Sequence, residues 1–264
     1  MKKDKILINI ENLSDIEEYK KIGINNFLFA VDNFSIGYKT FDINSLINIK
    51  ENKYLLINKI FNTEDINEFK EIIQLLNKFN GIIFEDIGVY HLLKDTNINL
   101  IWNQSHFATN YSSINYWLDL TNSAVISNEL TKEEVKEIID KSNKKIILNV
   151  FGKNNIMYSR RTLLTNFNKY FKLTTNKEII LKENISNCEF RMLENESGTF
   201  TFDNNYFNII DYIKYFNNDN ILFYLVYPFG LSVSEIKDII ENNSNIKYND
   251  GFMNKKTIYK LGDK

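Results

Sequence analysis

Cysteine, proline and histidine are scarce in this chain of 264 residues. It contains one cysteine, Cys188, one proline, Pro228, and two histidines, His91 and His106. A single cysteine excludes an internal disulfide and, by itself, a site of four thiolates. The two histidines lie far apart without an H-E-x-x-H pattern, so they are poor zinc ligands. We therefore expect no metal site within this chain.

Long apolar segments are absent as well. No segment approaches 18 uninterrupted apolar residues, and the first apolar run is broken by Asn9 and Glu11. This pattern argues against a membrane span and predicts a first strand in place of a signal peptide. The net charge of −2 argues against a general nucleic-acid coat protein, and 44% hydrophobic residues support a substantial core. Without a Pro/Gly/Ser-rich linker, we expect one domain, residues 1–264, in the cytoplasm.

Acidic residues are missing from one long stretch. Between Lys141 and Lys177 there is no Asp or Glu. The basic residues of this span are Lys141, Lys144, Lys145, Lys153, Arg160, Arg161, Lys169, Lys172 and Lys177. Such a run is either a solvated surface or an anion site. Paired guanidinium groups clamp phosphates or carboxylates, and interleaved aromatic residues stack on unpaired bases, so the run suits RNA or a small polyanion.

Strand and helix patterns alternate almost without a break. Residues Ile146–Val150 form a short apolar run that is typical of a strand buried on both faces. After Gly152, a basic loop leads into a helical pattern from Leu163 to Phe171, which we expect to complete one βα unit. A dinucleotide-binding sheet would carry a glycine-rich turn after its first strand, and the segment ENLSD after Ile10 has none. The sequence therefore predicts an α/β fold, a TIM-like (β/α) barrel whose working face is the loops after the strands.

The alternation is interrupted once, near residues 177–203. This segment reads as two or three antiparallel strands in succession, which do not belong to a βα repeat. We expect a small antiparallel insertion there.

Several stretches of the chain resemble segments of one known family. YSRRTLLTNF, residues 158–167, is close to the pattern Tyr-Ser-Gly-Arg-Cys-Leu-Leu-Ser-Asn-Tyr, with matches at Tyr158, Ser159, Arg161, Leu163, Leu164 and Asn166. Residues 104–138 match at Asn110, Trp117, Glu129 and Leu130, and residues 23–41, 84–94 and 198–213 are similar to further segments. In this order, over residues 20–240, they resemble peptidase U32, the collagenase-like proteases. The resemblance implies a barrel-like fold.

The chain departs from that family at its cysteines. The family's signature carries two cysteines at the positions held here by Asn155 and Thr162, and a later cysteine-bearing segment has no counterpart. In several members these thiolates are iron–sulfur ligands. Amide and hydroxyl groups do not replace thiolates around iron, so we expect no cluster or other cofactor to be bound by this chain alone.

The candidate catalytic residues are Glu129, Glu85 and His106. Glu85, Asp86 and Glu129 are predicted at strand ends, where they act on a ligand as acid or base, or order the loops through salt bridges to the arginines. His106 follows a strand and either reaches the mouth of the barrel or makes a structural hydrogen bond. Cys188 reads as a small buried residue, and Ser159 has no partner base visible in the sequence.

The candidate substrate-binding residues come mainly from the basic stretch and the signature motif. They are Arg160, Arg161, Tyr158, Ser159, Asn110, Asn166 and Lys153. We expect Arg160 and Arg161 to present their guanidinium groups at the open end of the barrel.

The resemblance also implies a function. Branches of the U32 family take part in oxygen-independent hydroxylation, including that of the wobble uridine of tRNA with prephenate as oxygen donor, and some work as pairs of unlike members. The resemblance therefore suggests a component of tRNA hydroxylation that binds RNA or an acid beside a cysteine-bearing U32 paralogue. Two alternatives stay open, a peptidase acting on collagen-like or other peptides, and a non-catalytic scaffold.

Overall fold

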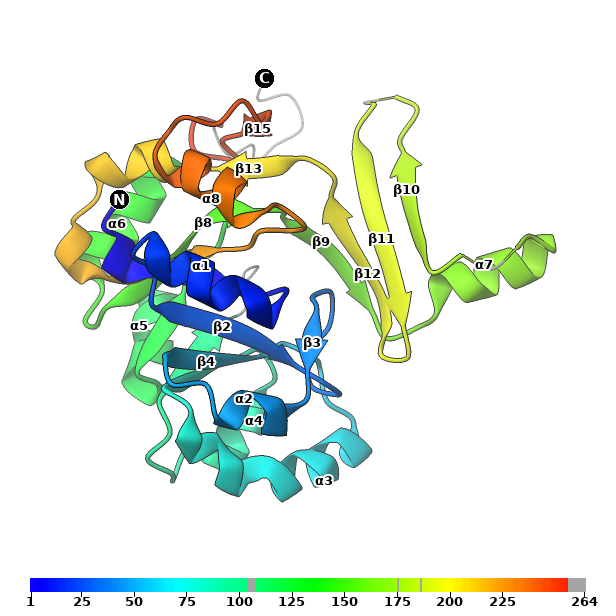
Figure 1. Ribbon diagram of the computed structural model, residues 1–264, viewed down its shortest axis with the longest axis horizontal. Helices are drawn as coiled ribbons and strands as arrows, with labels where there is room; N and C mark the ends of the chain where they lie inside the picture. Colours follow the sequence, from blue (N-terminus) through cyan, green and yellow to red (C-terminus); the bar gives the residue numbers. More distant parts are fainter. Residues whose placement is uncertain (104–107, 175, 186, 256–264) are drawn as a thin grey trace.

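Eight parallel strands close into a barrel in the computed structural model, which describes residues 1–103, 108–174, 176–185 and 187–255 (Figure 1). In spatial order the strands are β1 (Ile6–Asn9), β2 (Asn26–Val31), β4 (Asn52–Ile57), β5 (Gly81–Phe84), β6 (Leu100–Asn103), β7 (Ser123–Val125), β8 (Ile146–Gly152) and β14 (Ile221–Val226). Strand β14 pairs in parallel with both β8 and β1, which closes the ring. The expected TIM-like barrel is confirmed.

The barrel strands are apolar runs because both of their faces are buried. Every residue of β2 and of β8 is buried. Successive side chains point to opposite faces of a strand, so Leu28 fills the barrel interior while Phe27 and Phe29 pack in the outer layer. The interior is therefore a filled core and not a pore, as is usual for this fold.

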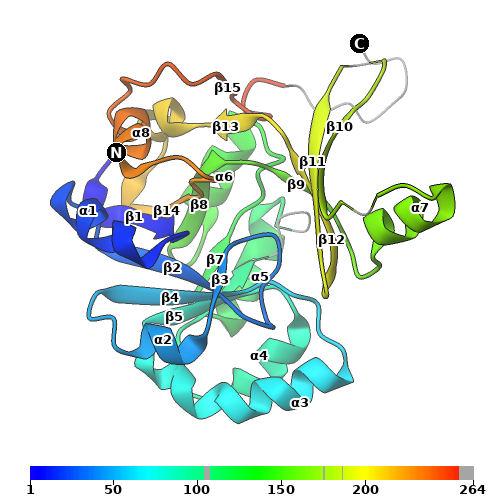
Figure 2. The same cartoon turned by 45° about the vertical axis from the view of Figure 1, so that its right-hand side comes forward.

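Helices follow the strands and cover the outside of the barrel (Figure 2). The α-helices of the barrel are α1 (Ile16–Lys21), α2 (Ile43–Ile47), α3 (Thr63–Ile72), α4 (Ile87–Leu93), α5 (Tyr111–Leu120), α6 (Lys132–Lys141) and α8 (Val233–Ile240). Short 3-10 helices span Lys3–Lys5, Leu13–Asp15, Ile73–Lys78, Ile210–Tyr215 and Asn218–Asn220. Capping residues mark where several of the α-helices begin. At α6, the Thr131 side chain caps the helix, and the Glu134 side chain accepts from the Thr131 N–H. In the described part of the chain, no helix is long and apolar enough to cross a membrane.

A second, antiparallel sheet interrupts the repeat after β8. Its strands lie in the order β10 (Glu178–Lys182), β11 (Glu189–Asn195), β12 (Gly198–Asp203) and β9 (Asn155–Ser159). The insertion expected near residues 177–203 is confirmed, but the sheet begins earlier than predicted. Residues 155–159, expected to be part of a barrel loop, pair with β12 instead.

Helix α7 (Leu163–Phe171) belongs to this insertion, and the expectation that it completes a barrel unit is wrong. It contacts β12, and its buried residues are Leu164 and Asn168. Figure 1 shows α7 beyond the antiparallel sheet, on the side away from the barrel. Helical spacing predicts an apolar face but does not say which surface that face meets. The connection to β14 runs instead through the 3-10 helix Ile210–Tyr215.

Aromatic rings on β12 pack the insertion against the loop that follows β2. Phe200 and Phe202 are buried with Ile36 from that loop, and the Tyr38 ring centroid lies 5.9 Å from that of Phe202. Between them, Gly37 has a backbone φ of +79°, and an added Cβ would lie 2.6 Å from Phe200 Cδ1. Glycine is required here both for the left-handed backbone and for the close approach of the ring.

Three short strands extend the barrel sheet. Strand β3 (Thr40–Phe41) pairs with β2, and β13 (Tyr206–Asn208) pairs with both β8 and β15 (Tyr248–Asn249). Residues 249–255 are thereby brought beside the carboxyl ends of the barrel strands.

Candidate functional site at the barrel mouth

A cavity of about 220 Å³ opens at the carboxyl ends of the barrel strands. Its polar lining comes from Asn149 within β8, from residues at or after strand ends, and from the insertion and other loops. The residues at or after strand ends are Asn58, Glu85, Asn103, Asn128, Glu129 and Tyr227, and the others are Tyr38, Lys153, Asn154, Asn155, Asp203, Asn249 and Lys255. Enzymes with this fold carry their active sites at this face of the barrel. The cavity is therefore the candidate functional site.

Glu85 lies in the cavity wall directly after β5. Its Oε1 accepts a hydrogen bond from Asn103 Nδ2 at 2.9 Å. Burial raises the pKa of the Glu85 carboxyl to about 8, because an anion loses more solvation than a neutral acid on leaving water. At neutral pH the carboxyl is mostly protonated, so it can donate a hydrogen bond or a proton to a ligand.

Two asparagines in the cavity wall keep a buried side-chain oxygen without a partner among the described residues. These atoms are Asn149 Oδ1 and Asn155 Oδ1, and Asn149 is only 9% exposed. Nearly all buried polar atoms in folded proteins are hydrogen-bonded. The two acceptors are therefore suited to a ligand that donates hydrogen bonds into the cavity.

Other amides in the wall hold the surrounding loops. Asn58 Oδ1 accepts from the Ile36 N–H at 2.9 Å, and Asn58 Nδ2 donates to the Ile36 carbonyl at 3.1 Å. Asn128 Nδ2 donates to Asn154 Oδ1 at 3.1 Å, which joins the loop after β7 to the start of the insertion. These amides shape the cavity through contacts within the protein.

Two tyrosines form one side of the cavity. The rings of Tyr38 and Tyr227 stack with their centroids 4.8 Å apart. Burial raises the pKa of both phenols, and the nearby carboxyl of Glu85 raises them further. The phenols therefore stay neutral, and each combines an apolar ring with a polar tip.

The predicted catalytic residues are partly brought together. Glu129, whose side chain is exposed, lines the same cavity as Glu85, and its N–H donates to Ser127 Oγ at 3.0 Å. His106 lies outside the described residues. Asp86 has a structural role, because its Oδ1 accepts from the Gly88 N–H at 2.6 Å and caps α4.

Lys153 also lines the cavity, but its ammonium group is held by the insertion. Its Nζ donates to the Asn204 carbonyl at 2.7 Å and to Asn204 Oδ1 at 3.1 Å. The same atom lies 4.8 Å from the centroid of the Tyr206 ring. Burial lowers the pKa of the Lys153 amine.

Tyr158 and Ser159 build the insertion and do not line the cavity. The Tyr158 hydroxyl donates to the Ser197 carbonyl at 3.0 Å, and its ring centroid lies 5.0 Å from that of Phe200. Ser159 Oγ accepts from the Arg161 N–H at 3.2 Å. The signature motif thus serves local structure at these positions.

Arg160 and Arg161 lie at the far end of β9. The strand begins at the cavity with Asn155 and rises about 3.3 Å per residue, which places Arg160 roughly 16 Å farther along. Both are exposed, and neither lines the cavity. They were expected at the barrel opening because residues 153–162 read as a barrel loop, and the pairing of β9 with β12 carries them away from it.

Asn110 and Asn166, the two asparagines predicted to bind substrate, lie in different parts of the structure. Asn110 Oδ1 accepts from the Ser113 N–H at 2.9 Å and caps α5, whereas Asn166 is exposed on α7. Neither lines the cavity.

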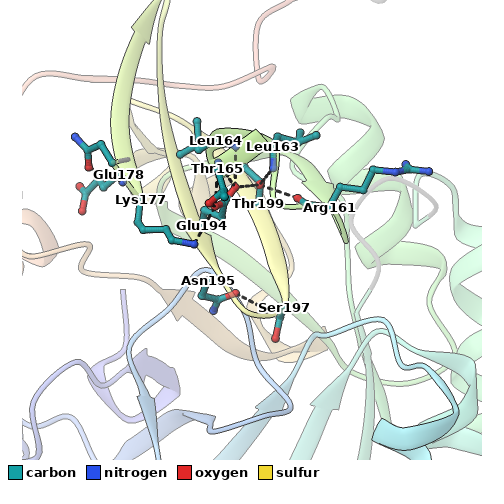
Figure 3. A network of polar contacts seen from close by, with 11 residues as sticks. Arg161, Leu163, Leu164, Thr165, Lys177, Glu178, Glu194, Asn195, Ser197 and Thr199 are labelled. Atoms are coloured by element: carbon teal, nitrogen blue, oxygen red, sulfur yellow. Dashed lines mark hydrogen bonds and ion pairs between the residues drawn. The ribbon is translucent and has the colours of Figure 1, made fainter. Parts of the chain in front are cut away.

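A buried carboxylate, that of Glu194, occupies the amino end of α7 (Figure 3). It accepts from the Leu164 N–H at 2.7 Å, from the Thr165 N–H and hydroxyl, from Thr199 Oγ1 at 3.1 Å and from Lys177 Nζ at 3.1 Å. Burial alone would raise the pKa of this carboxyl, but these hydrogen bonds outweigh it and lower the pKa to about 2. The anion at this helix end is thus supplied by the protein itself.

The acid-free run, residues 141–177, does not form one continuous surface. Lys144 Nζ donates to the Thr121 carbonyl at 2.9 Å near the start of β7, at the opposite end of the barrel from the cavity. Lys141 pairs with Glu137 on α6 at 2.6 Å. The basic residues that share the α7 end of the insertion are Arg160, Arg161, Lys169, Lys172 and Lys177.

Comparison with known proteins decides the family. The family model of peptidase family U32 matches residues 22–223. The chain belongs to peptidase family U32. One relative, the tRNA hydroxylation protein P2 of Bacillus subtilis (strain 168), is 22% identical over 234 residues, which are 81% of this chain and 76% of that protein.

Two solved structures are similar to parts of this chain. The U32 peptidase Mk0906 is 8% identical, with a TM-score of 0.48 over 57% of this chain and 70% of that one. The spore cortex-lytic enzyme SleL of Bacillus cereus is 11% identical, with a TM-score of 0.45 over 94% of this chain and 76% of that one. At these scores neither likeness bears on the function.

The donor set of this U32 protein does not fit an iron–sulfur cluster, which the resemblance implies for several members of the family. Clusters are held by several thiolates, and Cys188 is the one cysteine in the sequence. The expectation that Cys188 is buried is wrong, because it is exposed between β10 and β11. At the two signature positions, Asn155 presents an amide to the cavity and Thr162 precedes α7. Among the residues that the structure describes, no group of three or more His, Cys, Asp or Glu could hold a metal ion.

Sequence reasoning missed Asn103, Asn149, Tyr38 and Tyr227 as parts of the site. Asn149 left a signal, because it is the polar residue in the otherwise apolar run IILNVF of β8. Asn103 closes β6 and Tyr227 follows β14, so both stand where barrel strands end. Tyr38 left no such signal, since it comes from the long loop after β2.

Proposed function

We propose that this U32 protein takes part in tRNA hydroxylation, converting the wobble uridine to 5-hydroxyuridine as a subunit without a cluster. The observation that carries the proposal is the relation to a protein named for tRNA hydroxylation across 81% of this chain. The membership of family U32 and the polar cavity at the barrel mouth are compatible with it.

The cavity offers chemistry suited to an acid or a nucleobase. A neutral Glu85 carboxyl can donate a hydrogen bond to a carboxylate or a proton to a developing anion. The unpaired oxygens of Asn149 and Asn155 can accept from the N–H or hydroxyl groups of a ligand. We include prephenate as the co-substrate and a cysteine-bearing U32 paralogue as the partner that supplies what this chain lacks.

Deleting the gene and measuring nucleosides in bulk tRNA tests the proposal. We expect 5-hydroxyuridine to fall on deletion and to return when the wild-type chain is expressed. Affinity purification of the tagged chain from its own cells is expected to bring down a cysteine-rich U32 protein. Unchanged 5-hydroxyuridine after deletion would refute the proposal.

A digestion assay separates this function from the peptidase activity that the family description suggests. The purified chain is incubated with gelatin and with casein, each with and without chelator, and we expect no cleavage. Gelatin hydrolysis by the chain, combined with normal tRNA in the deletion strain, would support the peptidase instead.

A further inference from the structure

The α7 arm, residues 160–173, projects beyond the inserted sheet (Figures 1 and 2). Its aromatic side chains are exposed. Phe167 is 53% exposed, Tyr170 80% and Phe171 55%. Their rings form one cluster, with centroids 4.7 Å apart for Phe167 and Phe171 and 4.9 Å apart for Tyr170 and Phe171. A cluster of exposed apolar rings on a folded protein usually marks a binding surface.

The charge of the α7 arm is entirely positive. It carries four basic residues, Arg160, Arg161, Lys169 and Lys172, and no Asp or Glu, so its net charge is 4 − 0 = +4. All four are exposed, and none forms an ion pair with a described residue. This contrasts with the whole chain, in which 34 acids outnumber 32 bases.

The nearby carboxylate of Glu194 does not neutralise this surface. Its side chain is fully buried beneath the amino end of α7, where backbone N–H groups and Lys177 surround it (Figure 3). Its charge is used to fix the helix on β11 and β12, so the arm is held in a defined position.

Basic residues before α7 and at its end, on the same arm as open aromatic rings, fit an unpaired stretch of RNA. Unpaired bases stack on exposed rings, and each nucleotide supplies a phosphate for a nearby cation. A duplex hides its base faces, and a protein partner would have to bring several acids to the edge of an apolar patch. The charge complementarity therefore favours RNA.

We propose that the α7 arm docks an unpaired RNA loop, with Tyr170 and Phe171 stacking on bases and Arg160, Arg161, Lys169 and Lys172 contacting phosphates. The inference rests on the proposed function, because a tRNA substrate has such a loop. It adds a second surface, separate from the cavity, that holds the RNA while the barrel mouth receives the reacting nucleotide.

Fluorescence anisotropy with the full chain tests the docking. The probes are a labelled anticodon stem-loop and a fully paired RNA duplex of equal length. We expect the stem-loop to bind more tightly than the duplex. Tyr170→Ala should weaken stem-loop binding about tenfold, the loss of one stacked base, and Tyr170→Phe should retain binding because the ring remains.

The contribution of charge is measured from the salt dependence of binding. Arg160→Gln/Arg161→Gln should reduce the slope of log affinity against log salt by about 1.4, or about 0.7 for each lost phosphate contact on a single strand. The control Lys141→Gln/Lys145→Gln removes the same charge from the same acid-free run, but at the base of the barrel. It should leave the slope unchanged.

The inference is wrong if the arm variants bind the stem-loop as the wild type does, or if the control weakens binding equally. It is also wrong if Tyr170→Ala abolishes self-association in light scattering while RNA binding stays normal, since the arm would then be a protein interface. Urea midpoints equal to that of the wild type show that the variants are folded.

The docking surface and the proposed function can be refuted independently of each other. Arm-dependent RNA binding with unchanged 5-hydroxyuridine in the deletion strain would contradict the function and leave the docking surface standing. Loss of 5-hydroxyuridine on deletion, fully restored by Tyr170→Ala and by Arg160→Gln/Arg161→Gln, would contradict the docking surface alone.

Discussion

Glu85 is a carboxyl that the fold holds in its neutral form. The residue faces the cavity, and Asn103 donates to it at 2.9 Å. A pKa of about 8 lies above the ordinary value of 4.5. Between pH 4.5 and 8 the native state therefore keeps a proton that the unfolded state has already released. The stability that depends on this proton is complete at low pH and is lost as the pH rises through 8.

Glu85→Gln should abolish this pH dependence, because glutamine has the shape of the neutral acid and carries no charge. We expect urea unfolding to give similar stabilities for both proteins at pH 5. At pH 9 the variant should be more stable by on the order of 2 kcal/mol, a discounted figure since Glu85 keeps some exposure to the cavity. Parallel stability curves for the two proteins would show that the carboxyl ionises normally.

Asn149 differs from Asn58 in what its amide does for the fold. Asn149 Oδ1 has no partner in the described structure, whereas Asn58 makes two hydrogen bonds with Ile36. Asn149→Leu should therefore leave the free energy of unfolding unchanged within about 1 kcal/mol, while Asn58→Leu should lower it by about 2 kcal/mol. The comparison is made by urea denaturation. An equal loss for both would mean that the Asn149 amide serves the fold.

At the scale of elements, α7 depends on a single carboxylate. Glu194→Gln should lower stability by about 2–3 kcal/mol at pH 7, because hydrogen bonds to a buried charge are lost and an amide presents a donor to N–H groups. With a native pKa of about 2, this contribution is present above pH 4.5 and disappears as the pH falls from 4.5 to 2. Hydrogen exchange of the α7 amides together with urea unfolding measures both effects.

Glu178→Gln is the matched control in the same sheet. Glu178 pairs with Arg191 at 2.7 Å, but its side chain is 53% exposed. An exposed pair contributes little, so this variant should differ from the wild type by less than about 0.5 kcal/mol. If Glu178→Gln and Glu194→Gln had equal effects, the special role of the buried carboxylate would be refuted.

Whether a segment forms a helix or a strand was easier to predict than which other element it pairs with or packs against. Residues 163–171 form a helix as the spacing indicated, and residues 146–152 form a buried strand. The sequence could not show that β9 turns back to pair with β12, because strand pairing is a long-range choice between similar apolar segments. That one pairing moved Arg160 and Arg161 from the barrel mouth to the insertion.

At the scale of the whole molecule, the insertion and the barrel meet at Gly37. Gly37→Ala should lower stability by about 2 kcal/mol or more, since the backbone is left-handed and Cβ would strike the Phe200 ring. Gly230→Ala is the control, because its φ is +88° with nothing within 4 Å of the added Cβ. It should lose about 1 kcal/mol, the backbone part alone. Equal losses in urea unfolding would mean that the ring contact is unimportant.

The architecture of the site was predictable in outline and not in detail. Alternating apolar runs indicated the barrel, and strand ends placed Glu85 and Glu129 at its mouth, where both line the cavity. Asn149 escaped notice because it sits inside a buried strand, and its unpaired oxygen is visible only once its neighbours are known. Tyr38 reaches the cavity from a loop whose course depends on the insertion that packs over it.

The most direct test of the barrel mouth as the working site is the 5-hydroxyuridine content of tRNA in the deletion strain expressing Asn149→Leu. This variant is expected to fold as the wild type does, so a loss of function reports on the cavity and not on stability. We predict that the wild-type chain restores 5-hydroxyuridine and that Asn149→Leu, present at equal soluble level, does not. Full restoration by Asn149→Leu would contradict the assignment of this cavity.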